Sequence, residues 1–250
     1  MKAIILATAA VAAFAAAPAL AQDAVGSFGL GYVHSDADGF KNDGAAINGS
    51  VATSAFGDWT VTFDGSLNYA DENDFLGETT SALGAHVSRV FNGVRVGGFA
   101  AVQNNEMFDI ATVGAEVQKT FEQATLTGSV SYSDFLQTEA WNAGVDAAYY
   151  PMEALRLNAG VGYSTIDGVF GSGDSTDVWT YGVGAEYRIA ATPFSVFANY
   201  EQAQFDDIDL DVDTFKIGFR YNFGGSLQAQ DRSGANIGRA TRAPLNIFAN

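Results

Sequence analysis

A histidine and a serine, His86 and Ser88, stand two positions apart in a stretch where apolar and polar residues alternate. Side chains two positions apart on a strand share one face, and an imidazole beside a hydroxyl can take its proton and make it a nucleophile. No acidic residue near them in the sequence is positioned to orient the imidazole. Both residue types also suit an ordinary polar face of a strand. We therefore expect no enzymatic activity, and hydrolysis is an alternative that rests on this pair alone.

Carboxylates gather in two short runs, 36–43 and 206–213. Hard divalent cations such as Ca²⁺ and Mg²⁺ bind several oxygen ligands at once, and such runs supply them. The first run resembles part of a calcium loop, but Ile47 stands where the closing glutamate would be. The candidate Ca²⁺ or Mg²⁺ ligands are Asp36, Asp38, Asp43, Asp206, Asp207, Asp209, Asp211 and Asp213. A solvated acidic surface explains the same runs, and no other cofactor is expected.

Apolar residues alternate with small or polar residues in twelve short segments between about Val25 and Phe223. In the last segment Phe215 and Phe219 share one face, whereas Lys216 and Arg220 share the other. Successive side chains of a strand point to opposite faces, so each segment predicts a strand with one apolar and one polar face. The predicted strands are 25–34, 44–54, 58–69, 79–91, 93–103, 108–120, 124–133, 139–149, 154–165, 177–189, 193–203 and 212–223.

The connections between these strands alternate in length. Those at 35–43, 70–78, 133–139, 165–177 and 203–212 are long and mostly acidic, whereas the others are tight. Asn92-Gly93 is a strong hairpin signal. This alternation favours an all-β fold with one antiparallel, up-and-down β-barrel of about 12 strands, with 10 or 14 as alternatives. A soluble β-sandwich is the competing interpretation, although its crossover connections would not produce the same alternation.

The start, the composition and the end of the chain set further limits. Met1-Lys2, an uncharged apolar run and a small-residue site before Gln22 predict a signal peptide over 1–21. Cysteine is absent, and the net charge of −17 argues against nucleic-acid binding. We expect the barrel over 22–224 and a periplasmic tail over 225–250, rich in glycine at its start and flexible by composition. An alternative is that the tail folds back as a plug through Leu245–Phe248.

A barrel that is apolar outside and polar inside suits an outer membrane, and aromatic residues cluster near both ends of the predicted strands, as in membrane-interface girdles. The sequence Phe219-Arg-Tyr-Asn-Phe223 resembles the closing-strand motif of small Gram-negative outer-membrane β-barrels of the porin-like class. About 27 residues follow this motif, which usually stands at the very C-terminus. The resemblance implies localisation in the cell outer membrane, contact with its lipids and lipopolysaccharide, and recognition by the barrel-assembly machinery. It leaves the oligomeric state open. Some outer-membrane lipid hydrolases carry His-x-Ser on a strand, as His86 and Ser88 do here.

Charged residues of both signs fall on the face that the pattern turns inward. They are Asp64, Arg95, Glu116, Asp146, Arg156, Glu186, Arg188, Glu201, Lys216 and Arg220. Opposed charges across water form the constriction of a diffusion pore, whereas neutralising pairs across a narrow lumen close it. We expect a channel for passive diffusion of small hydrophilic solutes or ions, modestly cation-preferring because of its acidic outer loops. The alternative is a closed structural or adhesive barrel that acts through those loops.

Overall fold

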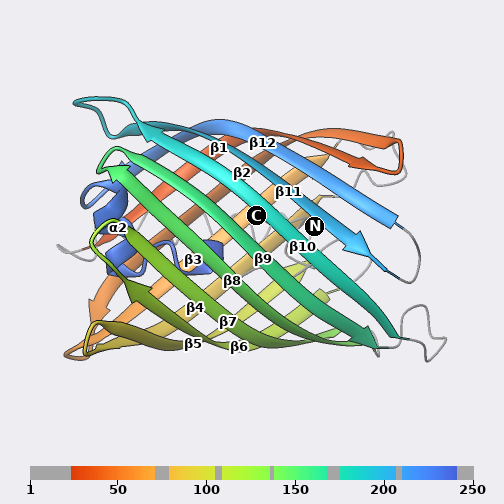
Figure 1. Ribbon diagram of the computed structural model, residues 1–250, viewed down its shortest axis with the longest axis horizontal. Helices are drawn as coiled ribbons and strands as arrows, with labels where there is room; N and C mark the ends of the chain where they lie inside the picture. The colour runs from red at the N-terminus through yellow and green to blue at the C-terminus, as the bar shows by residue number, and fades with distance from the viewer. Residues whose placement is uncertain are drawn as a thin grey trace.

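The computed structural model describes residues 24–70, 79–104, 109–135, 138–167, 175–206 and 210–240. Their strands form one closed barrel (Figure 1). The bounds are β1 Val25–Ala37, β2 Phe40–Ala55, β3 Trp59–Ala70, β4 Thr80–Phe91, β5 Val94–Asn104, β6 Asp109–Thr120, β7 Ala124–Phe135, β8 Thr138–Met152, β9 Leu155–Asp167, β10 Ser175–Arg188, β11 Phe194–Phe205 and β12 Leu210–Phe223.

Each strand pairs antiparallel with its neighbours in the sequence, and β1 pairs with β12 to close the ring. This last pairing runs from Gly26 opposite Phe223 to Ala37 opposite Val212. The prediction of a single up-and-down barrel of about 12 strands is therefore confirmed, and the β-sandwich is excluded. Closure matters physically because it leaves no strand edge with unpaired backbone groups.

The barrel is apolar outside and polar inside. Leu30, Val113 and Phe219 are each more than half exposed on the outer face, whereas Thr62, Ser164 and Ser195 are fully buried within. Exposed aromatic rings lie near both ends of the strands: Trp59, Phe91, Phe121, Tyr149 and Phe194 at the end with the tight turns, and Tyr32, Tyr69, Trp141 and Trp179 towards the other. A soluble protein buries such residues, so this surface fits a lipid environment.

One predicted loop is mostly strand. The sequence predicts a long connection over 35–43, yet β1 and β2 continue through it to a two-residue turn at Asp38 and Gly39. Both turn residues have positive φ, 50° and 91°, and the Gly39 amide donates to Asp36 Oδ1 at 2.8 Å. Opposite charges across the ladder, Asp36 facing Lys41, offset the repulsion that the acidic composition suggested.

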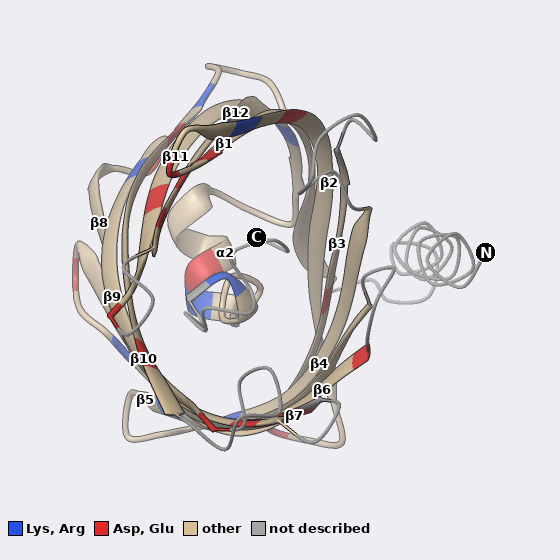
Figure 2. Ribbon diagram, turned by 90° about the vertical axis from the view of Figure 1, so that its right-hand side faces the viewer, with Lys and Arg blue, Asp and Glu red and all other residues tan. Residues whose placement is uncertain are grey.

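The chain after β12 turns into the barrel. A helix, α2 (Leu227–Ser233), and a short 3₁₀ helix, η2 (Gly238–Ala240), lie inside the ring of strands (Figure 2). Ser226 caps α2 by accepting from the Ala229 amide at 3.2 Å, and Gly234 ends it with a φ of 89°. The described part of the tail is thus an ordered plug rather than the flexible periplasmic extension that its composition suggested. Residues 241–250, with Leu245–Phe248, lie outside the described residues.

The predicted signal peptide, 1–21, also lies outside the described residues. Across the ranges that the structure describes, no helix is both long enough and apolar enough to cross a membrane.

Candidate functional site: the lumen and its plug

Residues 226–240, hereafter the plug, are held on one side by donors from the barrel wall. The Ser50 hydroxyl donates to the Ala235 carbonyl, and the Thr62 hydroxyl donates to the Gly234 carbonyl at 3.2 Å. Arg95 Nη2 donates to the Arg232 carbonyl at 2.9 Å. The Arg95 contact satisfies a carbonyl in the last turn of α2, which the helix leaves without a partner, and the other two satisfy carbonyls just beyond its end.

The plug also contacts the tight turn between β6 and β7. Gln228 Nε2 and Arg232 Nη2 each donate to the Glu122 carbonyl at 2.7 Å. Leu227, 2% exposed, packs in a cluster with Ala148 and Tyr150. Tyr150 faces inward because it continues the alternation of β8, in which Ala148 and the preceding even-numbered residues are the buried ones. The plug is therefore anchored at the barrel end that carries the tight turns (Figure 1).

All ten predicted lumen residues lie in the described part of the chain, and their strands turn them to the interior face. Arg95, Glu116, Asp146, Arg156, Glu186, Lys216 and Arg220 are buried, and Asp64, Arg188 and Glu201 are partly exposed. The structure brings four of them into two clusters, Asp64 and Glu116 in one and Glu186 and Arg220 in the other. Arg188 lies apart from both and donates to the Thr192 carbonyl at 3.0 Å and to the Gly225 carbonyl. A role in solute passage stays a prediction for all ten.

The first cluster surrounds His86. Its Nδ1 lies 2.9 Å from Glu116 Oε2, its Nε2 lies 2.7 Å from Asp64 Oδ2, and its ring stacks on Phe99 with centroids 5.2 Å apart. A carboxylate at each ring nitrogen accepts a hydrogen bond, and both nitrogens can donate only in the imidazolium form. Such a histidine has no free nitrogen with which to take a proton from a hydroxyl.

Ser88 belongs to a different contact. Its hydroxyl oxygen accepts from Arg95 Nη1 at 3.0 Å, and both Ser88 and His86 are buried in the lumen, away from the lipid-facing surface. This geometry does not support the histidine–serine pair as a hydrolytic centre.

The second cluster surrounds Glu186. Its carboxylate accepts from Arg220 Nη1 and from the Ser195 hydroxyl at 2.6 Å, and it lies 3.6 Å from Arg239 Nη1 of the plug. Arg239 also donates to the Ser27 hydroxyl. Burial, and then the Arg220 guanidinium, lower the pKa of Arg239 below its ordinary value, although Glu186 opposes this. Because the ordinary pKa of a guanidinium is so high, Arg239 stays charged at neutral pH.

Arg239 was missed as a lumen residue because it lies outside the strand pattern. Its only signal was the excess of arginines in the tail, which carries Arg232, Arg239 and Arg242 against the single acid Asp231. That excess predicts an anionic neighbour, and the buried Glu186 is one.

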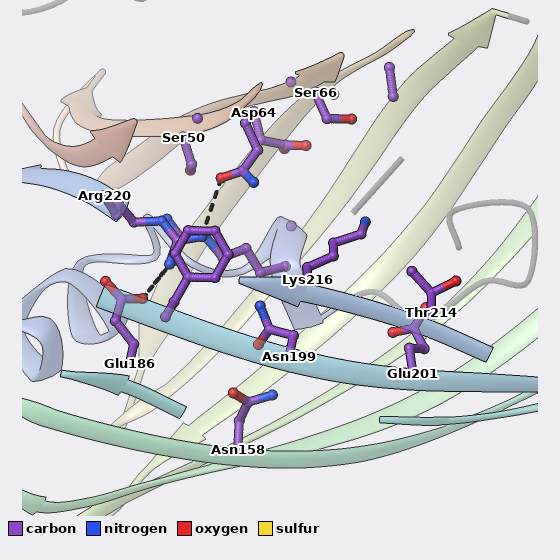
Figure 3. Close-up of a pocket in the computed structure, with 18 of the residues that line it drawn as sticks. Ser50, Asp64, Ser66, Asn158, Glu186, Asn199, Glu201, Thr214, Lys216 and Arg220 are labelled. Atoms are coloured by element: carbon purple, nitrogen blue, oxygen red, sulfur yellow. Dashed lines mark hydrogen bonds and ion pairs between the residues drawn. The ribbon is translucent and has the colours of Figure 1, made fainter. Parts of the chain in front are cut away.

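A cavity lies above the plug, and Gly238 and Arg239 form part of its lining (Figure 3). Its charged lining residues are Arg156, Lys216, Arg220 and Arg239, which are cationic, and Asp64, Glu186 and Glu201, which are anionic. Asn48, Asn158 and Asn199 add amide groups, and Ser50, Ser66 and Thr214 add hydroxyls. The cavity can therefore both donate hydrogen bonds to a small hydrophilic solute and accept them from it. Its wall carries four cationic side chains and three carboxylates.

The candidate cation ligands do not converge in the described part of the chain. Asp43 Oδ1 lies 2.6 Å from His34 Nδ1 and accepts from the Tyr32 hydroxyl, and Asp213 accepts from the Tyr200 hydroxyl at 2.6 Å. Within the described ranges no three His, Cys, Asp or Glu residues are grouped so as to hold a metal ion. Asp207 and Asp209 lie outside those ranges.

Comparison with known proteins agrees with this architecture. Two solved structures of the KdgM porin, one in complex with disordered oligogalacturonate, superpose with TM-scores of 0.52 and 0.51. Each superposition covers 80% of this chain and 99% of the porin chain. The sequence identity is 11% for the oligogalacturonate complex (TM-score 0.51) and 9% for the other structure (TM-score 0.52). At such identities the likeness shows the fold alone.

A curated relative, an uncharacterized protein of Nostoc sp., is 26% identical over 159 residues, which is 63% of this chain. The chain spans about a fifth of that relative, 22% of its length. The family model described as the outer membrane protein beta-barrel domain matches residues 77–223, more than half of the chain. The closed antiparallel barrel, its apolar exterior and this match agree, and the chain belongs to the outer-membrane β-barrel family as a porin-like protein of the cell outer membrane.

Proposed function

We propose that this barrel is a channel for passive diffusion of small hydrophilic solutes, with the plug at its narrowest part. The observation that carries the proposal is the polar cavity above the plug, lined by charged, amide and hydroxyl groups. A barrel that served only as a structural shell would not need such a lining, because burying polar groups costs free energy unless each finds a partner, and a hydrophilic solute can be that partner. The function needs no covalent chemistry, so we propose no enzymatic role.

A closed barrel that acts through its loops is the second candidate, and the plug itself favours it. Wall contacts from β2, β3 and β5 and from the β6–β7 turn hold the plug across the end with the tight turns. A plug that never leaves would stop diffusion, and the exposed hairpins would then carry the function.

Selectivity follows from two regions of opposite sign. The acidic hairpin ends favour cations at the outer mouth, as the sequence suggested. The cavity carries four cationic side chains against three carboxylates, so the lining gives no support to a cation preference. Because a narrow lumen focuses the field of the groups that line it, we propose that the cavity governs selectivity and that the channel weakly prefers anions.

Single-channel conductance of the refolded chain 22–250 in a planar bilayer under a salt gradient tests both functions. The matched variant ends at Gly225 and so lacks the plug. Small steps in the complete chain and larger steps in the variant support a channel narrowed by the plug. Steps in the variant alone support a barrel closed by the plug, and silence in both, with insertion shown by heat-sensitive gel mobility, rules out the channel. The sign of the reversal potential tests the anion preference.

We also propose three partners that the sequence suggested: outer-membrane lipids on the apolar exterior, lipopolysaccharide at the acidic hairpins through Ca²⁺ or Mg²⁺ bridges, and the assembly machinery at β12. Asp36 is a candidate for this bridge because it is partly exposed beside a hairpin tip, where its carboxylate lies 3.7 Å from Lys41 and accepts from the Gly39 amide. Co-purification of lipopolysaccharide that EDTA abolishes is the expected result. If lipopolysaccharide still co-purifies in the presence of EDTA, the proposed divalent bridge is wrong.

A further inference from the structure

The cationic residues of the cavity differ in what they bind. Arg220 contacts Glu186 and donates from Nη2 to Asn48 at 3.2 Å, and Arg156 donates to Asn158 at 2.9 Å and lies 3.8 Å from Asp146. Arg239 contacts Glu186 and Ser27. Lys216 is different, because its Nζ is buried and makes no hydrogen bond within the described residues.

Lys216 is also part of the cavity wall. It lines the cavity while only 7% exposed, and its side chain extends from β12 towards the wall that carries Asp64 and Ser66 (Figure 3). A buried ammonium without hydrogen-bond acceptors costs free energy, whereas an anion that enters the cavity would supply them. Glu201 acts on this ammonium through its charge, but the hydrogen-bonding capacity of Nζ is left for a ligand.

The neighbours of Lys216 restrict what the anion can be. Asn199 pairs directly with Lys216 across β11 and β12, and Thr214 and Glu201 pair with each other two residues further along the same inward faces. An amide, a hydroxyl and a carboxylate beside one ammonium match a ligand with one negative charge and one or more hydroxyls. A second negative charge on the ligand would meet Glu201 rather than another free cation, so a dianion fits less well.

We propose that Lys216 is the anion-binding residue of a solute subsite for small hydroxy-monocarboxylates. In this subsite the Lys216 ammonium donates to the ligand carboxylate, and Asn199, Thr214 and Glu201 contact the ligand hydroxyl. The inference rests on the proposed function in naming the solute class of the same cavity, but binding itself does not require that the solute pass the plug.

Isothermal titration of the refolded chain in detergent micelles at low salt tests the subsite, with L-lactate as the probe. The uncharged analogue 1,2-propanediol replaces the carboxylate by a hydroxymethyl group, and malate adds a second carboxylate. We expect saturable lactate binding, no detectable binding of 1,2-propanediol, and malate binding at least threefold weaker than that of lactate. Lys216→Met keeps the aliphatic stem and removes the charge, so it should weaken lactate binding at least tenfold.

Lys41→Met is the matched control, because it removes one ammonium from the exposed end of β2, outside the cavity. It should leave lactate affinity unchanged. Heat-sensitive gel mobility verifies folding, and Lys216→Gln replaces Lys216→Met if that variant fails to fold. Absence of saturable lactate binding, or equal affinity in the Lys216 variants and the parent, overturns the inference. Lactate binding in a protein that conducts no ions overturns the proposed channel alone, and conductance without lactate binding overturns the subsite alone.

Discussion

The packing of Leu227 makes the stability of the plug measurable. Leu227 is 2% exposed against Ala148 and Tyr150, whereas Ala229 and Arg232 of the same helix are exposed. Leucine-to-alanine changes in protein cores cost about 2 to 5 kcal/mol. Because water in the lumen can fill the vacated space, we take the lower end, about 2 kcal/mol. Leu227→Ala should then lower the equilibrium constant for plug docking about 30-fold.

Hydrogen exchange measures this change directly. The amides of Gln230, Gly234 and Ala235 donate to carbonyls within the plug, so they exchange only when the plug opens locally. Their exchange should speed up about 30-fold in Leu227→Ala, while the amides of β3 and β9 keep their protection. Ala229→Ser, on the exposed side of α2, is the control and should change exchange only about twofold, because it costs about 0.5 kcal/mol in helix propensity. An increase below threefold in Leu227→Ala would refute the view that this cluster holds the plug.

Three further changes test other contacts of the plug and the lumen. Gly234→Ala should cost about 1 to 2 kcal/mol of plug docking, since a side chain there takes a φ of 89° and its Cβ would lie 3.0 Å from Arg95 Cζ; the readout is the same exchange of plug amides. Gly238→Val should displace η2, because its Cβ would lie 2.6 Å from Asp64 Oδ2, and the conductance should approach that of the chain ending at Gly225; an unchanged conductance would contradict this. Glu186→Gln removes the charge shared by Arg220 and Arg239 and should destabilise the barrel by about 3 kcal/mol in urea unfolding from lipid vesicles, whereas Asp58→Asn, at an exposed turn, should have an effect within experimental error.

The alternation of apolar and polar residues was enough to predict most of the fold, because two physical requirements impose it. Lipid requires apolar side chains on every outward position, and the pleat then places the intervening residues inside. This is why the alternation along β10 and β12 was enough to predict that Glu186 and Lys216 face the interior, where the structure places them. The alternation of inward and outward residues does not say what an inward residue contacts. It therefore predicts neither the pairing of Glu186 with Arg239 nor the lack of a hydrogen bond to the Lys216 ammonium among the described residues.

The plug lay beyond this pattern for a physical reason. A helix of seven residues that touches polar groups on several sides has no continuous apolar stripe, and hydrophobic periodicity is the main signal for a helix. Two local signals were present, Ser226 at the N-cap and Gly234 just past the last turn. The hairpin at Asp38 and Gly39 was missed for a related reason: acidic composition describes the surface of a segment, whereas strand pairing depends on the partner opposite.

The route of the chain from β12 into the lumen links plug docking to the order of assembly. The plug is continuous with β12 through Gly224 and Gly225, and Arg239 bonds to Ser27 on β1, the strand that meets β12 to close the ring. Arg239 therefore reaches its site only once β1 and β12 have come together, since before then Ser27 and Glu186 belong to an open sheet. The barrel wall itself supplies Arg220 and Ser195 to Glu186, and the plug adds Arg239. Arg239 thus joins β10 to β1, which lie on either side of β11 and β12, so the docked plug spans the pairing of β1 with β12 that closes the ring.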